Sequence, residues 1–335
     1  ITMDQANAQF EELKKIDVRD EFAQLFLNKL ETNVKANVAY QIGSRTHNFR
    51  TSITATSNQK YNKGNEKSDY IISINEQLLP AKWVTVALGA NLNLSEVKNN
   101  GMDIKELNYI NQMTRILDEN GNYLPMNAQD SRSTYDSYYA LSTACRRDTV
   151  AKYRLPYDWD WNLKREANSR DNTEKNSDLR LTAKVNFMPV TGLSIELSYQ
   201  YQYINRYLRE YYNEDSWTVR NQVNNNARMD GTYTVPPGGM LYERKRFGAG
   251  NNYRGQITYD KKFKDHSLKV MAGTDWRKDY YDEHPYGYYG YDPQALTYAA
   301  QIDFKTPITP KLSGQSNYYQ TIPMIPGKYY FSIGG

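Results

Sequence analysis

The feature that most constrains the fold of this sequence is a period-two alternation of apolar and polar residues. It is clearest in residues 192–203. Successive side chains of a β-strand point to opposite sides, so such a segment has one apolar face and one polar face. The apolar set is Leu193, Ile195, Leu197, Tyr199, Tyr201 and Tyr203, and the polar set is Ser194, Glu196, Ser198, Gln200 and Gln202.

The same alternation recurs in seven further segments, each nine to twelve residues long. This length suits a tilted strand that crosses a lipid bilayer, whereas no stretch approaches the ~18 apolar residues of a membrane helix. We therefore expect eight antiparallel strands. The seven segments are 34–42, 47–57, 68–78, 83–94, 179–187, 253–263 and 267–277.

Connection lengths separate a membrane barrel from a soluble sheet. Short turns alternate strictly with long loops, which places all short turns on one side. That layout is typical of outer-membrane barrels, with short periplasmic turns and long extracellular loops, and it is rare in soluble sandwiches. The short turns are 43–46, 79–82, 188–192 and 264–266, and the loops are 58–66, 95–177, 207–249 and 281–327.

Composition agrees with a wall that has water on one side and lipid on the other. Mean hydropathy is −0.83 and only 39% of residues are hydrophobic, which is low for a buried core. Yet aromatic residues make up 13%, including 31 tyrosines, which is too many for a disordered chain. Aromatics near strand ends, such as Trp83, Phe263 and Tyr280, suggest two interfacial girdles. A soluble Tyr-rich sandwich remains an alternative on composition alone.

Charge and motifs exclude several functions. The net charge is +4, from 42 basic and 38 acidic residues, and no basic run is long enough to favour nucleic-acid binding. Three scattered histidines and one cysteine, Cys145, give no metal or disulfide framework, so we expect no metal and no cofactor. No nucleotide-binding or hydrolase motif occurs. We therefore expect no enzyme and no catalytic residue.

The most suggestive local feature is the run Asp158-Trp159-Asp160-Trp161 in the longest loop. Alternating Trp and Asp can stack on a sugar ring and accept hydrogen bonds from its hydroxyls. The alternative is that the tryptophans pack on neighbouring loops or on a lid protein. Trp217, Tyr138 and Tyr139 are weaker candidates for substrate binding with the same ambiguity.

The chain divides into two parts. Residues 1–32 have apolar residues at helical spacing, such as Phe22, Leu25 and Phe26, and we expect short helices or irregular structure connecting a plug region to the barrel wall. Residues 33–335 form a partial barrel, and residues 329–333 look like a ninth strand cut short. The chain opens without a signal peptide, so we expect a mature or incomplete chain.

Several stretches resemble the SusC/RagA family, the TonB-linked outer-membrane transporters of Bacteroidetes. They are "IDVRDEFAQLFLNKLETNVKANVAYQIGSRTHNFRTSITATSNQ", "SINEQLLPAKWVTVALGANLNLS", "LRLTAKVNFMPVTGLSIELSYQY" and "YRGQITYDKKFKDHSLKVMAGTDWRKD". Their order along the chain carries the resemblance, which covers most of residues 16–280 and the last few residues.

The resemblance implies a 22-stranded barrel closed by a plug, of which this chain would be an internal fragment. It implies import of oligosaccharides or peptides, powered by the TonB-ExbB-ExbD complex, with a SusD-like surface lipoprotein as lid. The sequence lacks a plug, a TonB box and a terminal aromatic strand, so energy coupling falls on no residue here. A passive porin or structural outer-membrane barrel fits the residues equally well. A soluble carbohydrate-binding or enzymatic β domain is a third possibility.

Overall fold

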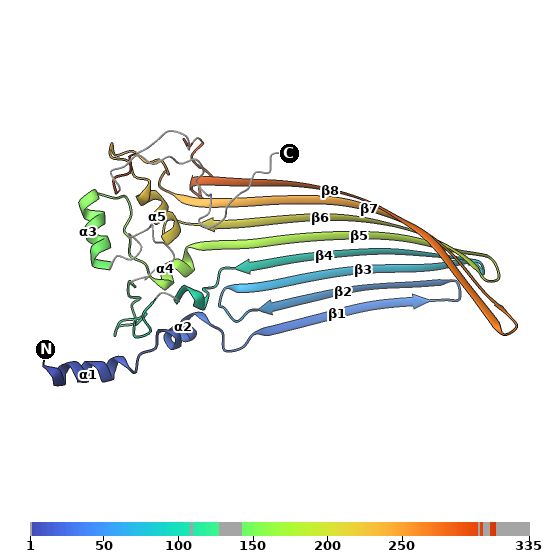
Figure 1. Cartoon of the computed structure of the whole chain (residues 1–335), viewed down its shortest axis with the longest axis horizontal. Helices are drawn as coiled ribbons and strands as arrows, with labels where there is room; N and C mark the ends of the chain where they lie inside the picture. The colour runs from blue at the N-terminus through green and yellow to red at the C-terminus, as the bar shows by residue number, and fades with distance from the viewer. Residues whose placement is uncertain (1, 108–109, 127–142, 301, 304–308, 313–335) are drawn as a thin grey trace.

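The protein folds into one open antiparallel β-sheet of eight strands arranged in sequence order (Figure 1). The computed structural model describes residues 2–107, 110–126, 143–300, 302–303 and 309–312. Within them, β1 and β8 pair on one side only, so the sheet is not closed. The strands are β1 (Thr32–Gly43), β2 (His47–Gln59), β3 (Asn65–Ala81), β4 (Val84–Asn99), β5 (Arg170–Val190), β6 (Leu193–Tyr212), β7 (Gly239–Phe263) and β8 (His266–Tyr291).

The register places the apolar residues of all eight strands on one face. Residues directly opposite each other in antiparallel strands share a face. One such row, from β1 to β8, is Val38, Ile53, Ile72, Leu92, Leu179, Tyr203, Ala249 and Tyr280. The predicted alternation is therefore confirmed, and the two sides of the sheet are an apolar face and a polar face.

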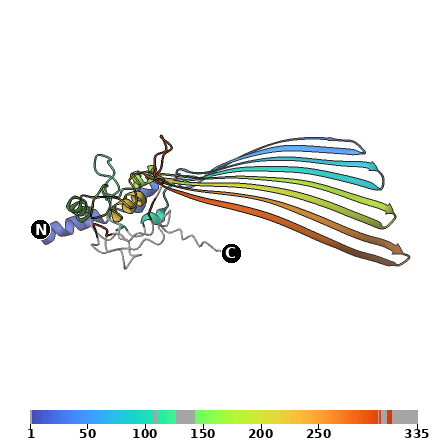
Figure 2. The same ribbon diagram turned by 90° about the horizontal axis from the view of Figure 1, so that it is seen from above.

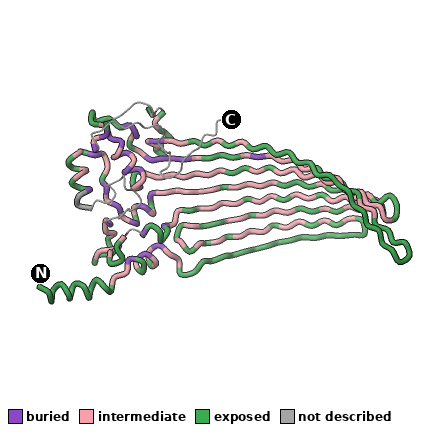
Figure 3. The backbone as a smooth tube through the Cα atoms, in the orientation of Figure 1, coloured by how far each residue is buried: buried purple, intermediate pink, exposed green. Residues whose placement is uncertain are grey.

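No second layer of described residues covers the apolar face. The side of the sheet that should be a core in a soluble protein is exposed: Val38 is 74%, Leu197 is 59% and Trp276 is 57% exposed. In Figure 3, buried residues gather in the helical end of the molecule and the adjoining strand ends, not along the strands. The predicted girdle residues Trp83, Phe263 and Tyr280 are exposed on or beside this face. The arrangement is consistent with a fragment of a β-barrel wall.

The apolar band runs diagonally across the hydrogen-bonded rows. In β1 the apolar band extends from Val34 to Ile42. Followed through the paired residues of each strand, Val34 lies in the same row as His284 of β8, and Ile42 lies in the same row as Trp276. In β8 itself, however, the band extends from Tyr280 to Leu268. It therefore shifts by four residues at one end (His284 against Tyr280) and by eight at the other (Trp276 against Leu268). A mean shift of ~20 Å across seven strand spacings of ~4.8 Å corresponds to a strand tilt of ~30°. Membrane barrels have tilts of about 35–45°.

Strands β4 to β8 are longer than the alternation predicts, and the predicted loops are correspondingly too long. The connection predicted at 95–177 comprises only residues 100–169, and the one predicted at 207–249 comprises only residues 213–238. The loop predicted to start at residue 281 starts after Tyr291. The reason is visible in β7. Beyond Phe247 the outward residues Lys245 and Glu243 are polar, while the inward Tyr242 is buried. The apolar pattern therefore stops or inverts before the strand pairing ends.

The helices lie at the end of the sheet opposite the short turns (Figures 1 and 2). We call the described parts of residues 2–31, 100–126, 143–169 and 213–238 the cap. Among these residues, no helix is long and apolar enough to cross a lipid bilayer. The helices are α1 (Met3–Leu13), α2 (Val18–Phe26), the 3-10 helix η1 (Ile104–Leu107), α3 (Thr143–Tyr153), α4 (Leu163–Asn168) and α5 (Trp217–Asn225).

Residues 2–31 belong to the cap. The Asp17 side chain accepts a hydrogen bond from the Arg19 backbone N–H at 2.9 Å and starts α2. Val18, Phe22 and Phe26 follow at intervals of four and are buried, in one cluster with loop residues such as Ile116 and Trp161. The predicted helical spacing is therefore realised at the loop end of the sheet. The role of this segment as a connection to a plug stays a prediction.

Candidate functional site

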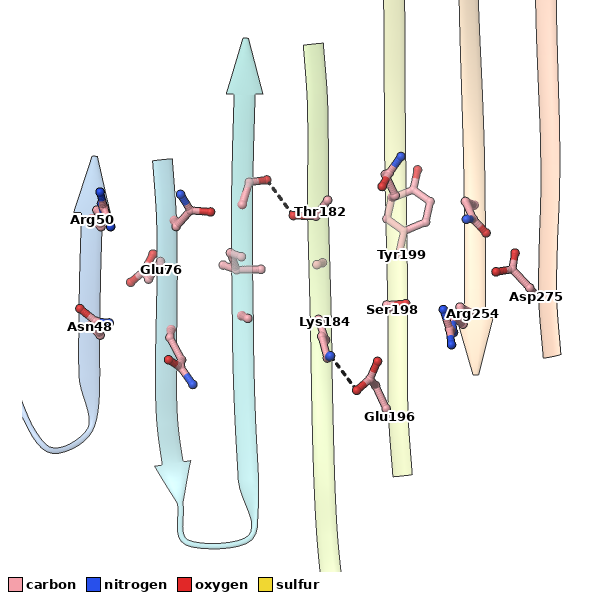
Figure 4. Close-up of a pocket in the computed structure, with 18 residues that line it drawn as sticks. Asn48, Arg50, Glu76, Thr182, Lys184, Glu196, Ser198, Tyr199, Arg254 and Asp275 are labelled. Carbon is pink, nitrogen blue, oxygen red and sulfur yellow. Dashed lines mark hydrogen bonds and ion pairs between the residues drawn. The ribbon is translucent and has the colours of Figure 1, made fainter. Parts of the chain in front are cut away.

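The polar face of the sheet contains a hollow of about 680 Å³ (Figure 4). Its lining comes from seven neighbouring strands, β2 to β8, which is possible only if the sheet curves toward the polar side. We call this surface the polar wall. The polar side chains that line the hollow include Asn48, Arg50, Asn75, Gln77, Thr182, Lys184, Glu196, Ser198, Gln200, Asn252, Arg254 and Asp275.

Charges on the polar wall are mostly paired with neighbours on the same face. The Lys184 Nζ and Glu196 Oε2 atoms are 2.6 Å apart across β5 and β6. Other pairs are Arg277 with Asp279 at 2.7 Å, Lys269 with Asp260 at 3.7 Å and Arg180 with Asp178 at 4.0 Å. The basic residues of these pairs are thus interleaved with acids on the polar wall. Together with the amides, they make a hydrated surface that offers many weak hydrogen bonds to a polar solute.

The Asp158–Trp161 run lies in the cap, and both of its tryptophans are buried. Trp159 is 2% and Trp161 is 8% exposed. The Trp159 ring centroid lies 6.5 Å from that of Trp217, and the Arg146 guanidinium lies 5.0 Å from the Trp217 ring centroid. Neither buried ring offers a free face to a sugar, so the packing alternative describes them. Tyr138 and Tyr139 lie outside the described residues.

Arg220 of α5 holds this run in place from inside the cap. Its side chain is fully buried. The guanidinium donates to the carboxylate of Asp158 at 2.7 Å and to the backbone carbonyls of Asp160 at 2.7 Å and Asp215 at 3.2 Å. Burying an arginine is costly unless its charge is paired and its donors are bonded. The Arg220 Nη2 atom makes no hydrogen bond to any described residue but lies 3.6 Å from a Glu166 carboxylate oxygen. No periodic pattern marks Arg220 in the sequence, because its role depends on contacts 60 residues away.

The two aspartates of the run are engaged in the cap. Asp158 also accepts from Arg165 at 2.8 Å, and Asp160 pairs with Arg147 at 2.5 Å. Burial opposes ionisation of Asp158, but the hydrogen bond from Arg165 and the charges of Arg220 and Arg165 outweigh it, so its pKa lies below the ordinary 3.8. These carboxylates bind the cap together, and the side chain of Asp158 is half exposed.

Glu166 is the buried acid of the cap and was not singled out by the sequence. It is 6% exposed. Burial raises its pKa to about 7, although the Trp217 backbone N–H, which donates to it at 2.6 Å, and the nearby Arg220 favour the ionised form. It packs inside the cap at the start of α5 and lines no hollow, so we assign it a structural role.

The cap rests on the polar side of the extended strands. Val219 and Val223 of α5 are buried against Met240 and Tyr289. Met240 pairs with Tyr212, which lies on the same face as Gln200 because an even number of residues separates them. The cap therefore covers the loop end of the polar wall, while the apolar face stays uncovered. Among the described residues, no three His, Cys, Asp or Glu side chains form a potential metal site.

Comparison with known proteins gives a match in fold. No protein-family model and no curated protein matches the sequence. The structure of the RagAB peptide transporter aligns with a TM-score of 0.58 at 12% identity, covering 86% of this chain and 28% of that chain. The RagAB peptide importer in its closed-closed state gives 0.59 at 12% identity, covering 84% and 28%. Its open-open state gives 0.55 at 12% identity, covering 81% and 27%.

This chain therefore spans about 28% of the length of the first two solved chains. The likeness establishes a shared fold: a long antiparallel sheet consistent with part of a β-barrel.

Proposed function

We propose that this chain is part of the wall of a bacterial outer-membrane transporter of the SusC/RagA type, which imports oligopeptides or oligosaccharides. The barrel would be completed by further strands and closed by a plug. In this proposal the polar wall lines the route of the cargo, and the cap forms part of its extracellular mouth. No chemical step is assigned to any residue, so we propose transport without catalysis.

The observation that carries the proposal is the uncovered apolar band. In β6 it extends over the ten residue steps from Leu193 to Tyr203, which is ~33 Å along the strand. At a tilt of ~30–45° this spans ~23–29 Å, which matches the ~25 Å apolar belt of membrane barrels. A sheet exposing such a belt on one face and a hydrated, curved surface on the other is suited to enclosing a water-filled lumen within lipid.

The proposed partners follow from the resemblance in sequence and in fold. The solved relatives are named as RagAB assemblies, so a surface lipoprotein of the SusD type is the partner we propose for the cap end. Energy would come from TonB-ExbB-ExbD acting on parts of the transporter other than the residues described above.

Membrane location is tested by fractionating cells that produce the natural full-length protein. We expect it in the outer-membrane fraction, extractable only with detergent and shifting in gel mobility on boiling. Recovery of a stable monomer in aqueous buffer would exclude the membrane assignment and favour a soluble β domain.

Active import is tested by following uptake of labelled peptides and oligosaccharides in cells with and without the gene, and with and without TonB. We expect uptake of one cargo class to need both. Uptake that needs the gene but persists without TonB would instead identify a passive pore, the second candidate. No uptake difference for either cargo class would reject both.

A further inference from the structure

Three arginines gather on the polar wall between the hollow and the cap. Arg206 of β6 lies directly opposite Arg246 of β7, and Arg244 lies two residues further along β7 on the same face. Arg254 of the hollow shares this face, because eight residues separate it from Arg246 and the strand keeps its register between them. We call Arg206, Arg244 and Arg246 the arginine cluster.

The arginine cluster has too few acids to neutralise it. Glu283 of β8 lies 3.0 Å from Arg246 and 3.6 Å from Arg244, so one carboxylate serves two guanidinium groups. Within the described part of the chain, Arg206 has no acidic partner within 4.0 Å. Like charges opposite each other in a sheet are destabilising, so an additional anion between Arg206 and Arg246 would be favourable.

The cluster differs from the paired charges of the polar wall. Several basic residues there have their own acid, as in the Lys184–Glu196 pair at 2.6 Å, whereas in the cluster three arginines share one acid. The cluster is also accessible, since the side chains of Arg244 and Arg246 are 46% and 47% exposed. Arginine forks bind carboxylates through two parallel hydrogen bonds, and two neighbouring forks with one shared acid leave such donors available.

A tyrosine fixes one side of the cluster. The Arg246 guanidinium lies 5.8 Å from the Tyr281 ring centroid. The ring lies over Gly248, where an added Cβ would come within 2.5 Å of a Tyr281 ring carbon. Glycine at this position therefore lets the ring lie flat across the neighbouring strand, and the ring in turn supports Arg246.

We propose that the arginine cluster is a carboxylate-binding site at the outer part of the lumen, which receives an acidic side chain or the C-terminal carboxylate of an oligopeptide cargo. This inference rests on the proposed transport function and narrows its substrate class. Arg206 and Arg246 bind the carboxylate, and Glu283 and Tyr281 position Arg246.

The test measures binding of two matched fluorescent peptides to the full-length protein in detergent: one with acidic side chains and a free C-terminus, and one with amides in their place. In the double variant R206Q/R246Q we expect affinity for the acidic peptide to fall about tenfold or more, since hydrogen bonds to charged groups are lost. Affinity for the amide peptide should stay within about twofold. Equal loss for both peptides, or no loss for the acidic one, would overturn the proposal.

Lys245→Gln is the matched control. Lys245 lies between Arg244 and Arg246 in sequence but points to the opposite face of the sheet. It is compared with Arg246→Gln, which removes the same charge from the same strand, and we expect no change in acidic-peptide binding for Lys245→Gln. A fall equal to that of Arg246→Gln would mean that overall charge, not the cluster, attracts the peptide, and would refute the site.

Two further measurements keep the test decisive. If R206Q/R246Q does not assemble, R206K/R246K is measured instead. It keeps both positive charges but loses the two-pronged guanidinium groups, so we expect a smaller loss of affinity than in R206Q/R246Q, and for the acidic peptide only. Uptake in cells separates the two proposals. If the wild type imports both peptides and R206Q/R246Q imports the acidic one equally well, the site alone is refuted. If the wild type binds the acidic peptide but imports neither peptide, transport is refuted.

Discussion

The sheet and the cap are stabilised in opposite ways. Along the sheet, large apolar residues such as Val38 and Leu197 are exposed, and the strands form a single layer. In the cap, Trp159 and Phe22 are buried, and even the charged Arg220 is fully enclosed. The sheet therefore depends on what surrounds it, whereas the cap carries its own core, built from segments far apart in sequence.

This contrast shows how to tell a structural residue from a functional one in such a chain. The Trp and Asp residues that look most like a binding site are used to hold the cap together. The polar residues of β5 to β8, which look unremarkable in sequence, line the hollow and form the arginine cluster. Four changes test the contrast.

The largest effect is expected from Arg220→Ala in the cap. Removing one partner of a buried, hydrogen-bonded charge pair costs ~3–5 kcal/mol, so the contacts of α5 with the Asp158–Trp161 run should be lost. Hydrogen exchange of cap amides in the full-length protein measures this. Arg147→Ala is the control, because Arg147 pairs with Asp160 at the exposed surface. Equal exchange in the two variants would contradict a buried core in the cap.

The next effect is expected from Leu197→Arg in the middle of the apolar band. A charge on the lipid face costs ~2–4 kcal/mol near the bilayer midplane, so the yield of assembled, detergent-extracted protein should fall. Ser198→Arg places the same side chain on the polar wall and should be tolerated. If both variants assembled equally well, the apolar face would not be in contact with lipid.

A pH effect is expected in the cap from Glu166. Its folded pKa of about 7 lies above the ordinary 4.5, so the stability that the neutral form provides is complete below pH 4.5 and is lost as pH rises through 7. Cap amides should therefore exchange more slowly at pH 5.5 than at pH 8 after correction for intrinsic rates. The low pKa of Asp158 keeps that group ionised throughout this window.

Glu166→Gln keeps an acceptor for the Trp217 N–H but cannot ionise, so it should remove this pH dependence. A variant with the same pH response as the wild type would show that another group causes it.

The smallest effect is expected from Lys184→Gln on the polar wall. The pair with Glu196 is partly exposed, and such pairs contribute ~0–1 kcal/mol. Thermal unfolding of the assembled barrel should change little. A loss of several kcal/mol would show that charges on the wall, and not lipid contact, stabilise the sheet.

The sequence was sufficient to predict the eight strands, their turns and the direction of the two faces. Period-two alternation depends on one environment on each side, and between Leu193 and Tyr203 both environments are constant. The prediction from alternation failed where the environment of one face changes within a strand. In β7, Tyr242 and Met240 turn inward and are buried under the cap, so the polar side becomes apolar and the pattern no longer indicates a strand.

The cap and the arginine cluster could not be predicted for a related reason. Arg220 meets Asp158 and Asp160 across about 60 residues of sequence, and no local pattern encodes that contact. The cluster needs the pairing of Arg206 with Arg246, and both residues lie beyond the ends of the predicted strand segments 192–203 and 253–263.

Among the described residues, the two outer strands of the sheet are unpaired along one border each, and this affects the behaviour of this polypeptide on its own. Each leaves a row of amide hydrogens and carbonyl oxygens along β1 or β8, and hydrocarbon offers nothing to bond them. Produced alone, the chain should pair through its edge strands with other copies or precipitate, because only a closed barrel leaves no edge strand unpaired. Under the proposed function, assembly in the bilayer would therefore be an all-or-none property of the closed barrel, to which these eight strands would contribute one part.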